Sequence, residues 1–120
     1  MGTPPGPPKP LPQAATLALL WSIFLAEGAC KASVPFGWLP LKAAWQAGRV
    51  PFYQVMNQVR RELALEWGKY QKAIAEGKWQ GDFILWLARV GYNANPKEWD
   101  AWEQNVRFFL KALTGEATME

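Results

Sequence analysis

Residues 51–77 read PFYQVMNQVRRELALEWGKYQKAIAEG and predict the longest helix of the chain. The apolar residues recur three or four positions apart, which places them on one continuous helical face. This face consists of Met56, Val59, Leu63, Trp67, Tyr70 and Ile74. Pro51 is favoured in the first turn of a helix, and Gly77 is favoured at its end. Gly68 could interrupt the helix or allow another segment to pack closely against it.

Two shorter helices are expected before this one. Residues 13–27 are apolar nearly all round and are followed by Gly28, so they predict a central, buried helix. A loop with Pro35 and Gly37 follows, and residues 39–47 predict a short helix that ends at Gly48.

Two more helices are expected after it. Residues 82–90 predict a helix that stops at Gly91, with Phe83, Leu87 and Val90 facing inward. The last helix begins at Asn95-Pro96-Lys97-Glu98, in which an N-cap asparagine, a proline and a glutamate follow the usual order. Its inward face is Trp99, Trp102, Val106, Phe109 and Leu113. No stretch alternates like a strand, so the fold class is all-α, a compact bundle of about five helices.

The chain is expected to form one domain. Its 120 residues are 50% hydrophobic, enough to bury a core, and they show no internal repeat. Residues 1–12, MGTPPGPPKPLP, predict a disordered Pro-rich arm. The single helical domain then covers residues 13–114, and residues 115–120 are expected to be a flexible tail.

The composition limits the chemistry that the protein can perform. A net charge of +3 favours an anionic partner, such as a cell-wall polymer, phospholipid or nucleic acid. Cys30 is the only cysteine and histidine is absent, so no internal disulfide, zinc site or Ser–His or Cys–His pair is expected. No metal and no cofactor are predicted, and acid–base chemistry must use carboxylates, tyrosine or lysine.

The apolar run over residues 14–26 predicts neither a stable membrane span nor a secretory signal. It is too short to cross a bilayer, and the segment before it has Lys9 as its only cation. The sequence AEGAC at residues 26–30 is similar to a lipoprotein cleavage box, but Glu27 occupies the position of an aliphatic residue. Synthesis in the cytoplasm without a signal peptide is the preferred interpretation.

Glu27 is the leading candidate for a functional residue. It lies at the end of an apolar helix, where Leu20, Ile23 and Phe24 would desolvate the carboxylate and raise its pKa. The partial negative charge at the helix C-terminus raises the pKa further. A carboxyl group that keeps its proton is what a glycosidase uses to protonate the departing sugar oxygen. The alternative is a solvated glutamate at a helix end.

The order of motifs resembles the glucosaminidase domains of bacteria and phages, which are peptidoglycan hydrolases of the lysozyme-like superfamily. The matching motifs are Glu27-Gly28, Phe36-Gly37, Phe52-Tyr53 through Tyr70-Gln71-Lys72-Ala73, and Gly91-Tyr92-Asn93-Ala94-Asn95-Pro96 followed by Trp99. The resemblance covers about residues 14–113, with the motifs in the same order. The resemblance implies a lysozyme-like fold that acts on the glycan strand of peptidoglycan, as a phage lysin or virion-associated enzyme would.

The resemblance also implies a role for each matching residue. Glu27 would be the general acid, and Tyr92 beside it would position the sugar or a water molecule. Phe36 and Gly37 would form the floor of a groove, and Trp38 and Trp99 would stack on sugar rings. The alternative for Tyr92 is a half-buried turn residue, and the alternative for Phe36 and the two tryptophans is core packing.

The chain departs from this family between its first two motifs. Phe36 follows Glu27 by nine positions, a shorter interval than in the family, and residues 28–61 contain no Asp or Glu. The β-hairpin lobe that supplies a second carboxylate in the family is therefore expected to be reduced or absent. Three alternatives therefore remain for the function. The protein could hydrolyse the glycan strand as a glucosaminidase or muramidase, it could act as a lytic transglycosylase that closes a 1,6-anhydro ring, or it could be an inactive relative that binds the cell wall.

The competing hypothesis is a non-enzymatic helical module, such as a small virion or nucleic-acid-associated protein. Its support is a stretch in which cations alternate with aromatic residues, as in single-strand binding grooves. These residues are Lys31, Trp38, Lys42, Trp45, Arg49, Phe52, Tyr53, Arg60 and Arg61. A third alternative is a helical partner-binding protein with Trp79 and Trp86 as anchors.

Overall fold

The computed structural model describes residues 9–93 and 95–120, and these residues form helices and turns without any strand. The helices are α1 (Gln13–Ala26), α2 (Lys42–Gln46), α3 (Phe52–Ala75), α4 (Phe83–Trp86) and α5 (Trp99–Thr114). Short 3-10 turns cover Ala29–Lys31, Pro35–Gly37, Leu39–Leu41 and Pro96–Glu98, and a π-helical turn covers Leu87–Gly91. The predicted all-α bundle of about five helices is confirmed, and no β-hairpin lobe occurs in the described part of the chain.

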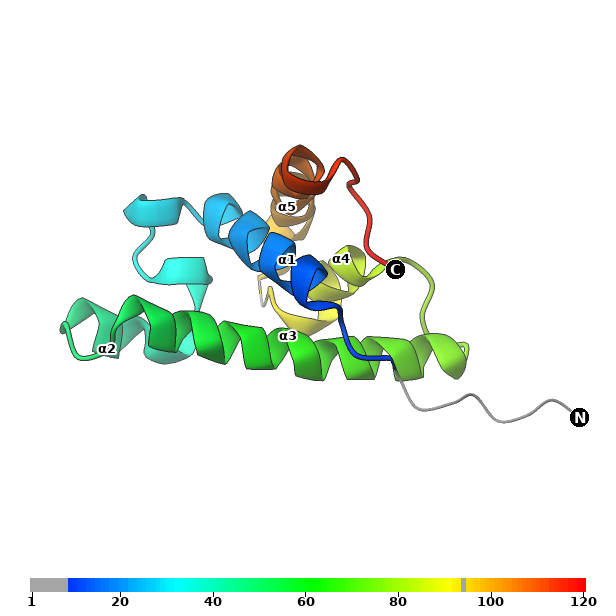
Figure 1. Ribbon diagram of the computed structural model, residues 1–120, viewed down its shortest axis with the longest axis horizontal. Helices are drawn as coiled ribbons and strands as arrows, with labels where there is room; N and C mark the ends of the chain where they lie inside the picture. Colours follow the sequence, from blue (N-terminus) through cyan, green and yellow to red (C-terminus); the bar gives the residue numbers. More distant parts are fainter. Residues whose placement is uncertain (1–8, 94) are drawn as a thin grey trace, which may run out of the picture.

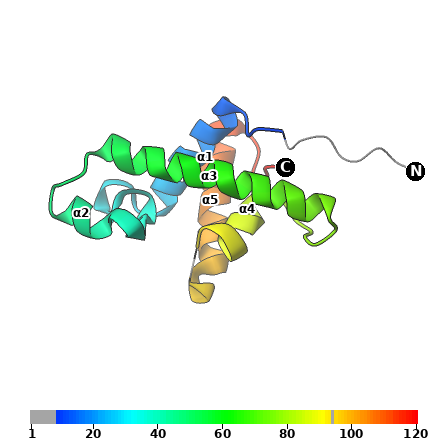
Figure 2. The ribbon, with the colours of Figure 1, turned by 90° about the horizontal axis from the view of Figure 1, so that it is seen from below.

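Helix α3 runs along the length of the molecule, and α1 crosses it (Figure 1). α1 packs against α5 over its longest interface and against α3 as well, so it lies between these two helices. Seen from below, α5 runs across α3 rather than along it (Figure 2). The fully buried side chains between the helices include Leu19, Leu20, Ile23, Val55, Val59, Leu63, Phe83, Ile84, Leu87, Val106 and Leu110.

The expectation that the first helix is buried all round is wrong. Leu19, Leu20 and Ile23 are inaccessible to solvent, whereas Trp21 and Leu25 are 43% and 37% exposed. The reason is that α3 and α5 cover only part of the helix surface. Burial of one side is sufficient to hold α1, because each buried leucine or isoleucine side chain contributes about 1.5–3 kcal/mol.

The stripe predicted for the longest helix forms the buried face of α3. Val59, Leu63, Trp67 and Tyr70 are buried, and Gly68 continues the helix without a break. Ile74 is 42% exposed, because the last turns of α3 extend beyond the helices packed on it (Figure 1).

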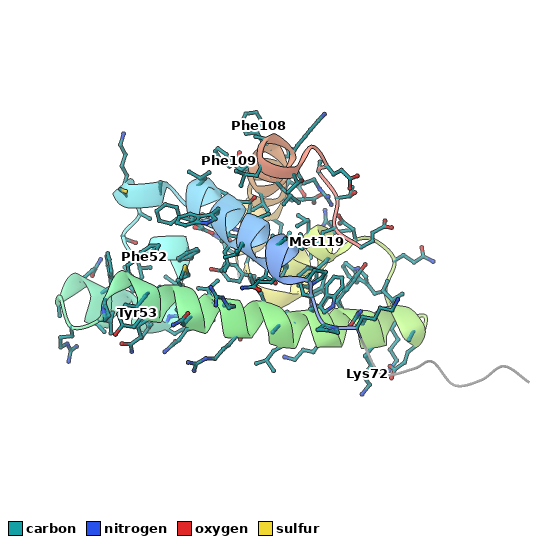
Figure 3. The ribbon with its side chains drawn as sticks, viewed as in Figure 1. Phe52, Tyr53, Lys72, Phe108, Phe109 and Met119 are labelled. Carbon is teal, nitrogen blue, oxygen red and sulfur yellow. The ribbon has the colours of Figure 1, made fainter. Side chains whose placement is uncertain are left out.

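The inward faces predicted for the last two helices need correction. Val90 is 55% exposed, because the π-helical turn after α4 shifts the helical phase and buries Ala88 instead. On α5, Leu113 is 52% exposed and Leu110 takes its place in the core, four residues after Val106. Two aromatic side chains, Phe108 and Phe109, point away from the bundle at the outer side of α5 (Figure 3).

Both ends of the described chain pack on the helices. The indole Nε1 of Trp67 donates a hydrogen bond to the Lys9 carbonyl at 2.7 Å. At the other end, Phe83 N donates to the Met119 carbonyl at 2.8 Å, and Met119 points back toward the helices (Figure 3). Residues 9–12 and 117–119 are therefore part of the folded unit, while the rest of the predicted Pro-rich arm, residues 1–8, lies outside the described residues.

Within residues 9–93 and 95–120, no helix combines the length and the apolar character that a bilayer crossing requires.

Candidate active site

The candidate site is a groove of 730 Å³ between the end of α1, the loop before α2, the middle of α3 and the loop before α5. This volume lies within the range of about 300–1,000 Å³ that is typical of ligand sites. Its lining residues are Glu27, Ser33, Gly37, Trp38, Leu39, Pro40, Glu62, Gly91, Tyr92, Asn93, Asn95, Pro96 and Glu98. Three carboxyl groups from three different elements therefore share one groove with two aromatic rings.

Glu27 is positioned by the end of α1. Gly28 follows it with a φ of 104°, a left-handed conformation that ends the helix and leaves the glutamate at the C-cap. The half-buried carboxylate accepts a hydrogen bond from Trp102 Nε1 to Oε1 at 2.6 Å. Burial raises the pKa of Glu27, the charge of Glu98 raises it further, and the Trp102 hydrogen bond opposes this rise.

The turn at residues 36–37 brings backbone against that carboxylate. Phe36 and Gly37 both adopt positive φ angles, 63° and 62°, and the conformation is strained for phenylalanine. The Phe36 ring is completely buried, 5.4 Å from Phe24 and 5.6 Å from Phe52 between ring centroids. The Phe36 side chain therefore packs in the core, the alternative given for it above, and it does not line the groove, whereas Gly37 does.

Tyr92 lines the same groove as Glu27. Its ring stacks between Trp38 and Trp102, with centroid distances of 5.8 Å and 5.6 Å. Its hydroxyl donates a hydrogen bond to the Phe36 carbonyl at 2.5 Å. Burial, followed by the charges of Glu27 and Glu62, raises the pKa of Tyr92 well above 10, so the hydroxyl keeps its proton.

The two tryptophans predicted to stack on sugars have different surroundings. Trp38 is partly exposed in the groove, and its indole Nε1 donates to Gln58 Oε1 at 3.2 Å. Trp99 does not line the groove; its Nε1 donates to the Asn93 carbonyl at 3.1 Å, and the Arg89 guanidinium lies 6.0 Å from its ring. Trp99 therefore fixes the loop before α5, and only Trp38 is placed to contact a ligand.

Sequence reasoning missed Glu62 and Glu98. Glu62 comes one residue after the acid-free stretch, three residues after Val59, so it flanks the buried stripe of α3. Glu98 ends the 3-10 turn before α5. The helical spacing could have placed Glu62 next to the core, but only the packing of α3 brings it into the groove with Glu27.

A buried carboxylate, that of Glu66, lies next to Glu62 on α3. Glu66, one turn later on α3, accepts a hydrogen bond from Trp86 Nε1 at 2.9 Å and pairs with Lys69 Nζ at 3.2 Å. Burial raises the pKa of Glu62, and the charge of Glu66 and a hydrogen bond between the two carboxyl groups raise it further. Gly91 leaves the space for this arrangement, because a Cβ there would lie 2.8 Å from the Glu66 Cδ.

Substituting Gly37 by alanine is expected to displace the Glu27 carboxyl group. A Cβ at this position would lie 2.6 Å from Glu27 Cδ, and the positive φ itself costs alanine about 1–2 kcal/mol. Gly48→Ala is the matched control, because Gly48 has a φ of 70° and a Cβ added there would have open space for 4 Å around it. Urea unfolding should show a larger stability loss for Gly37→Ala, and equal losses would contradict the close packing of Gly37 on Glu27.

Comparisons with protein-family models, with curated proteins and with solved structures gave no match. Among the residues that the structure describes, no three His, Cys, Asp or Glu side chains are grouped as ligands of a metal ion.

Proposed function

We propose that this protein cleaves the glycan strand of peptidoglycan, with Glu27 as the general acid. The observation that carries the proposal is the half-buried Glu27 carboxyl group, which faces a groove and has a raised pKa. A carboxyl group in this state can protonate the glycosidic oxygen as the C–O bond breaks. The motif order of the sequence supports the same reaction class, and the fold would then be a lysozyme-like bundle without the β-lobe.

The hydrogen bond from Trp102 makes the two carboxyl oxygens of Glu27 inequivalent. Its indole N–H occupies Oε1, which leaves Oε2 to carry the proton toward the substrate. After the proton has been transferred, the same hydrogen bond stabilises the resulting carboxylate. Trp102 is itself held by stacking on Tyr92, so the donor keeps one orientation during the reaction.

The remainder of the groove suits an uncharged sugar chain. Trp38 stacks on Tyr92, and the part of its ring that stays exposed in the groove can contact a sugar ring. The side-chain nitrogen of Asn93 is buried and has no hydrogen-bond partner among residues 9–93 and 95–120. It can donate a hydrogen bond to an acetamido carbonyl of the substrate.

The nucleic-acid hypothesis has less support at this groove. Lys31, Lys42 and Arg49 are exposed but do not line it, whereas three carboxyl groups do. The charges of Glu62 and Glu98 would repel the phosphates of a nucleic acid, and they do not oppose binding of the sugar backbone of peptidoglycan. We therefore propose that the protein acts at the cell wall, either as a phage lysin or as part of a virion.

The test is the release of soluble fragments from dye-labelled, purified peptidoglycan by the wild-type protein. Fragments with cleaved glycan strands, identified by mass spectrometry, are the expected result. If a protein that is folded by circular dichroism releases nothing, the proposal fails. Binding of single-stranded DNA that weakens steeply with added salt would then favour the nucleic-acid hypothesis.

A further inference from the structure

Glu62 is the second carboxyl group in the groove that has a defined environment. It projects from the middle of α3, and Glu27 projects from the end of α1, so different helices hold the two groups. Both carboxyl groups line the groove together with Tyr92, whose pKa is raised by burial and then by the charges of Glu27 and Glu62. The groove therefore has acidic groups on two of its walls around the stacked tyrosine.

The pair of Glu62 and Glu66 has the arrangement of a base and its orienting partner. Glu66 is fixed by Trp86 Nε1 and Lys69 Nζ, and it lies one helical turn after Glu62 on α3. Glu66 itself does not line the groove, so Glu62 is the member of the pair that a substrate or a water molecule can reach.

We infer that Glu62 is the catalytic base that activates water, that Glu66 positions it, and that the protein consequently hydrolyses the glycan strand. This inference rests on the proposed function. Glu62 removes a proton from water while the water oxygen bonds to the anomeric carbon. The C–O bond to the leaving sugar breaks, its electron pair stays on the leaving oxygen, and Glu27 protonates that oxygen. Exchange of protons with solvent then restores both carboxyl groups.

Glu98 is the weaker candidate for this role. Its side chain is exposed, and its carboxylate makes no hydrogen bond to the residues that the structure describes. Its charge acts on Glu27, whose pKa it raises. Glu98 therefore favours the protonated form of the acid, whereas Glu62 has the buried partner that a base requires.

The experiment measures the products and the rates of Glu62 variants on purified peptidoglycan. Wild type is expected to release fragments with reducing ends. Glu62→Gln and Glu62→Ala are expected to lower the rate about 100-fold, the usual lower range for loss of a general base. Sodium azide should restore cleavage by Glu62→Ala and form a glycosyl azide, because this anion needs no base. Glu76→Gln, an exposed glutamate outside the groove, is the matched control.

The positioning role of Glu66 has a separate readout. Glu62 must be ionised to act as the base, and the charge of Glu66 raises its pKa while that of Lys69 lowers it. Glu66→Gln is therefore expected to move the acidic limb of the pH–rate profile to lower pH and to reduce kcat with little change in KM. An unchanged acidic limb would contradict the positioning role.

The outcomes separate this inference from the proposed function. Fragments that end in 1,6-anhydro sugars, or full activity of both Glu62 variants, would overturn the role of Glu62 and leave glycan cleavage by Glu27 intact. Absence of cleavage by the folded wild-type protein would overturn both. Reducing ends together with azide rescue would support the inference, because a purely structural role of Glu62 predicts no rescue.

Discussion

Glu27→Gln is expected to lower the rate of glycan cleavage about 1,000-fold, since general acid catalysis is typically worth 100- to 10,000-fold. The amide has nearly the shape of the carboxyl group, and its oxygen can still accept the hydrogen bond from Trp102 Nε1. What it lacks is an acidic proton for the leaving oxygen. The measurement is the initial rate of dye release at equal concentrations of folded protein, with Glu76→Gln as the control.

The stability of the same variant shows whether lost activity reflects unfolding. The folded-state pKa of Glu27 is raised above its ordinary value of 4.5, so the wild type is most stable with Glu27 protonated and loses stability as pH rises through the raised pKa. Glutamine does not titrate. Glu27→Gln should therefore be more stable than wild type at pH 7, and the difference should disappear below pH 4.5. A variant that is less stable and also inactive would not identify Glu27 as the acid.

Asp82→Ala is expected to reduce the free energy of unfolding by about 3 kcal/mol, the lower range for removal of one partner of a buried ion pair. Asp82 is 7% exposed and accepts two hydrogen bonds from Arg107, at 2.7 Å and 2.8 Å. It also caps α4 through Leu85 N and holds the tail through Met119 N, each at 3.1 Å. The alanine variant leaves the Arg107 charge and both backbone donors without this acceptor.

Urea unfolding measures this effect, and Asp100→Ala is the matched control because Asp100 forms an exposed pair with Arg89. Burial opposes ionisation of Asp82, but the Arg107 and backbone hydrogen bonds together lower its pKa below the ordinary 3.8. Its contribution to stability is therefore complete above pH 3.8 and is lost as pH falls through the lowered pKa. If Asp82→Ala lowered the free energy of unfolding at pH 7 no more than Asp100→Ala does, the proposal that Asp82 joins α4, α5 and the C-terminal tail would be contradicted.

Much of the fold could be predicted from local patterns. The stripe of α3 and the Asn95 cap are short-range features, and the Asn95 side chain does accept a hydrogen bond from Lys97 N at 3.1 Å. The π-helical turn after α4 could not be predicted in this way, because the pattern of Phe83, Leu87 and Val90 also fits a regular helix. The one-sided burial of α1 depends on which helices pack on it.

The candidate site was predictable only in part for the same reason. Glu27 could be selected because its environment comes from its own helix and from Gly28. Its hydrogen-bond donor, Trp102, is 75 residues away in the sequence, and Glu62 reaches the groove only through the packing of α3. A buried tryptophan usually finds a partner for its N–H group, but the sequence does not indicate which one.

The central claim is that Glu27 holds a proton at the groove under conditions in which an ordinary glutamate is ionised. Its most direct test is a ¹³C NMR titration of the Glu27 side-chain carboxyl carbon in the wild-type protein, assigned by its absence from the Glu27→Gln spectrum. We predict a pKa above 4.5 that falls when Glu98 is replaced by glutamine. A pKa at or below 4.5 would mean that the carboxyl group is ionised like a solvated glutamate, and it would contradict the assignment of Glu27 as the general acid.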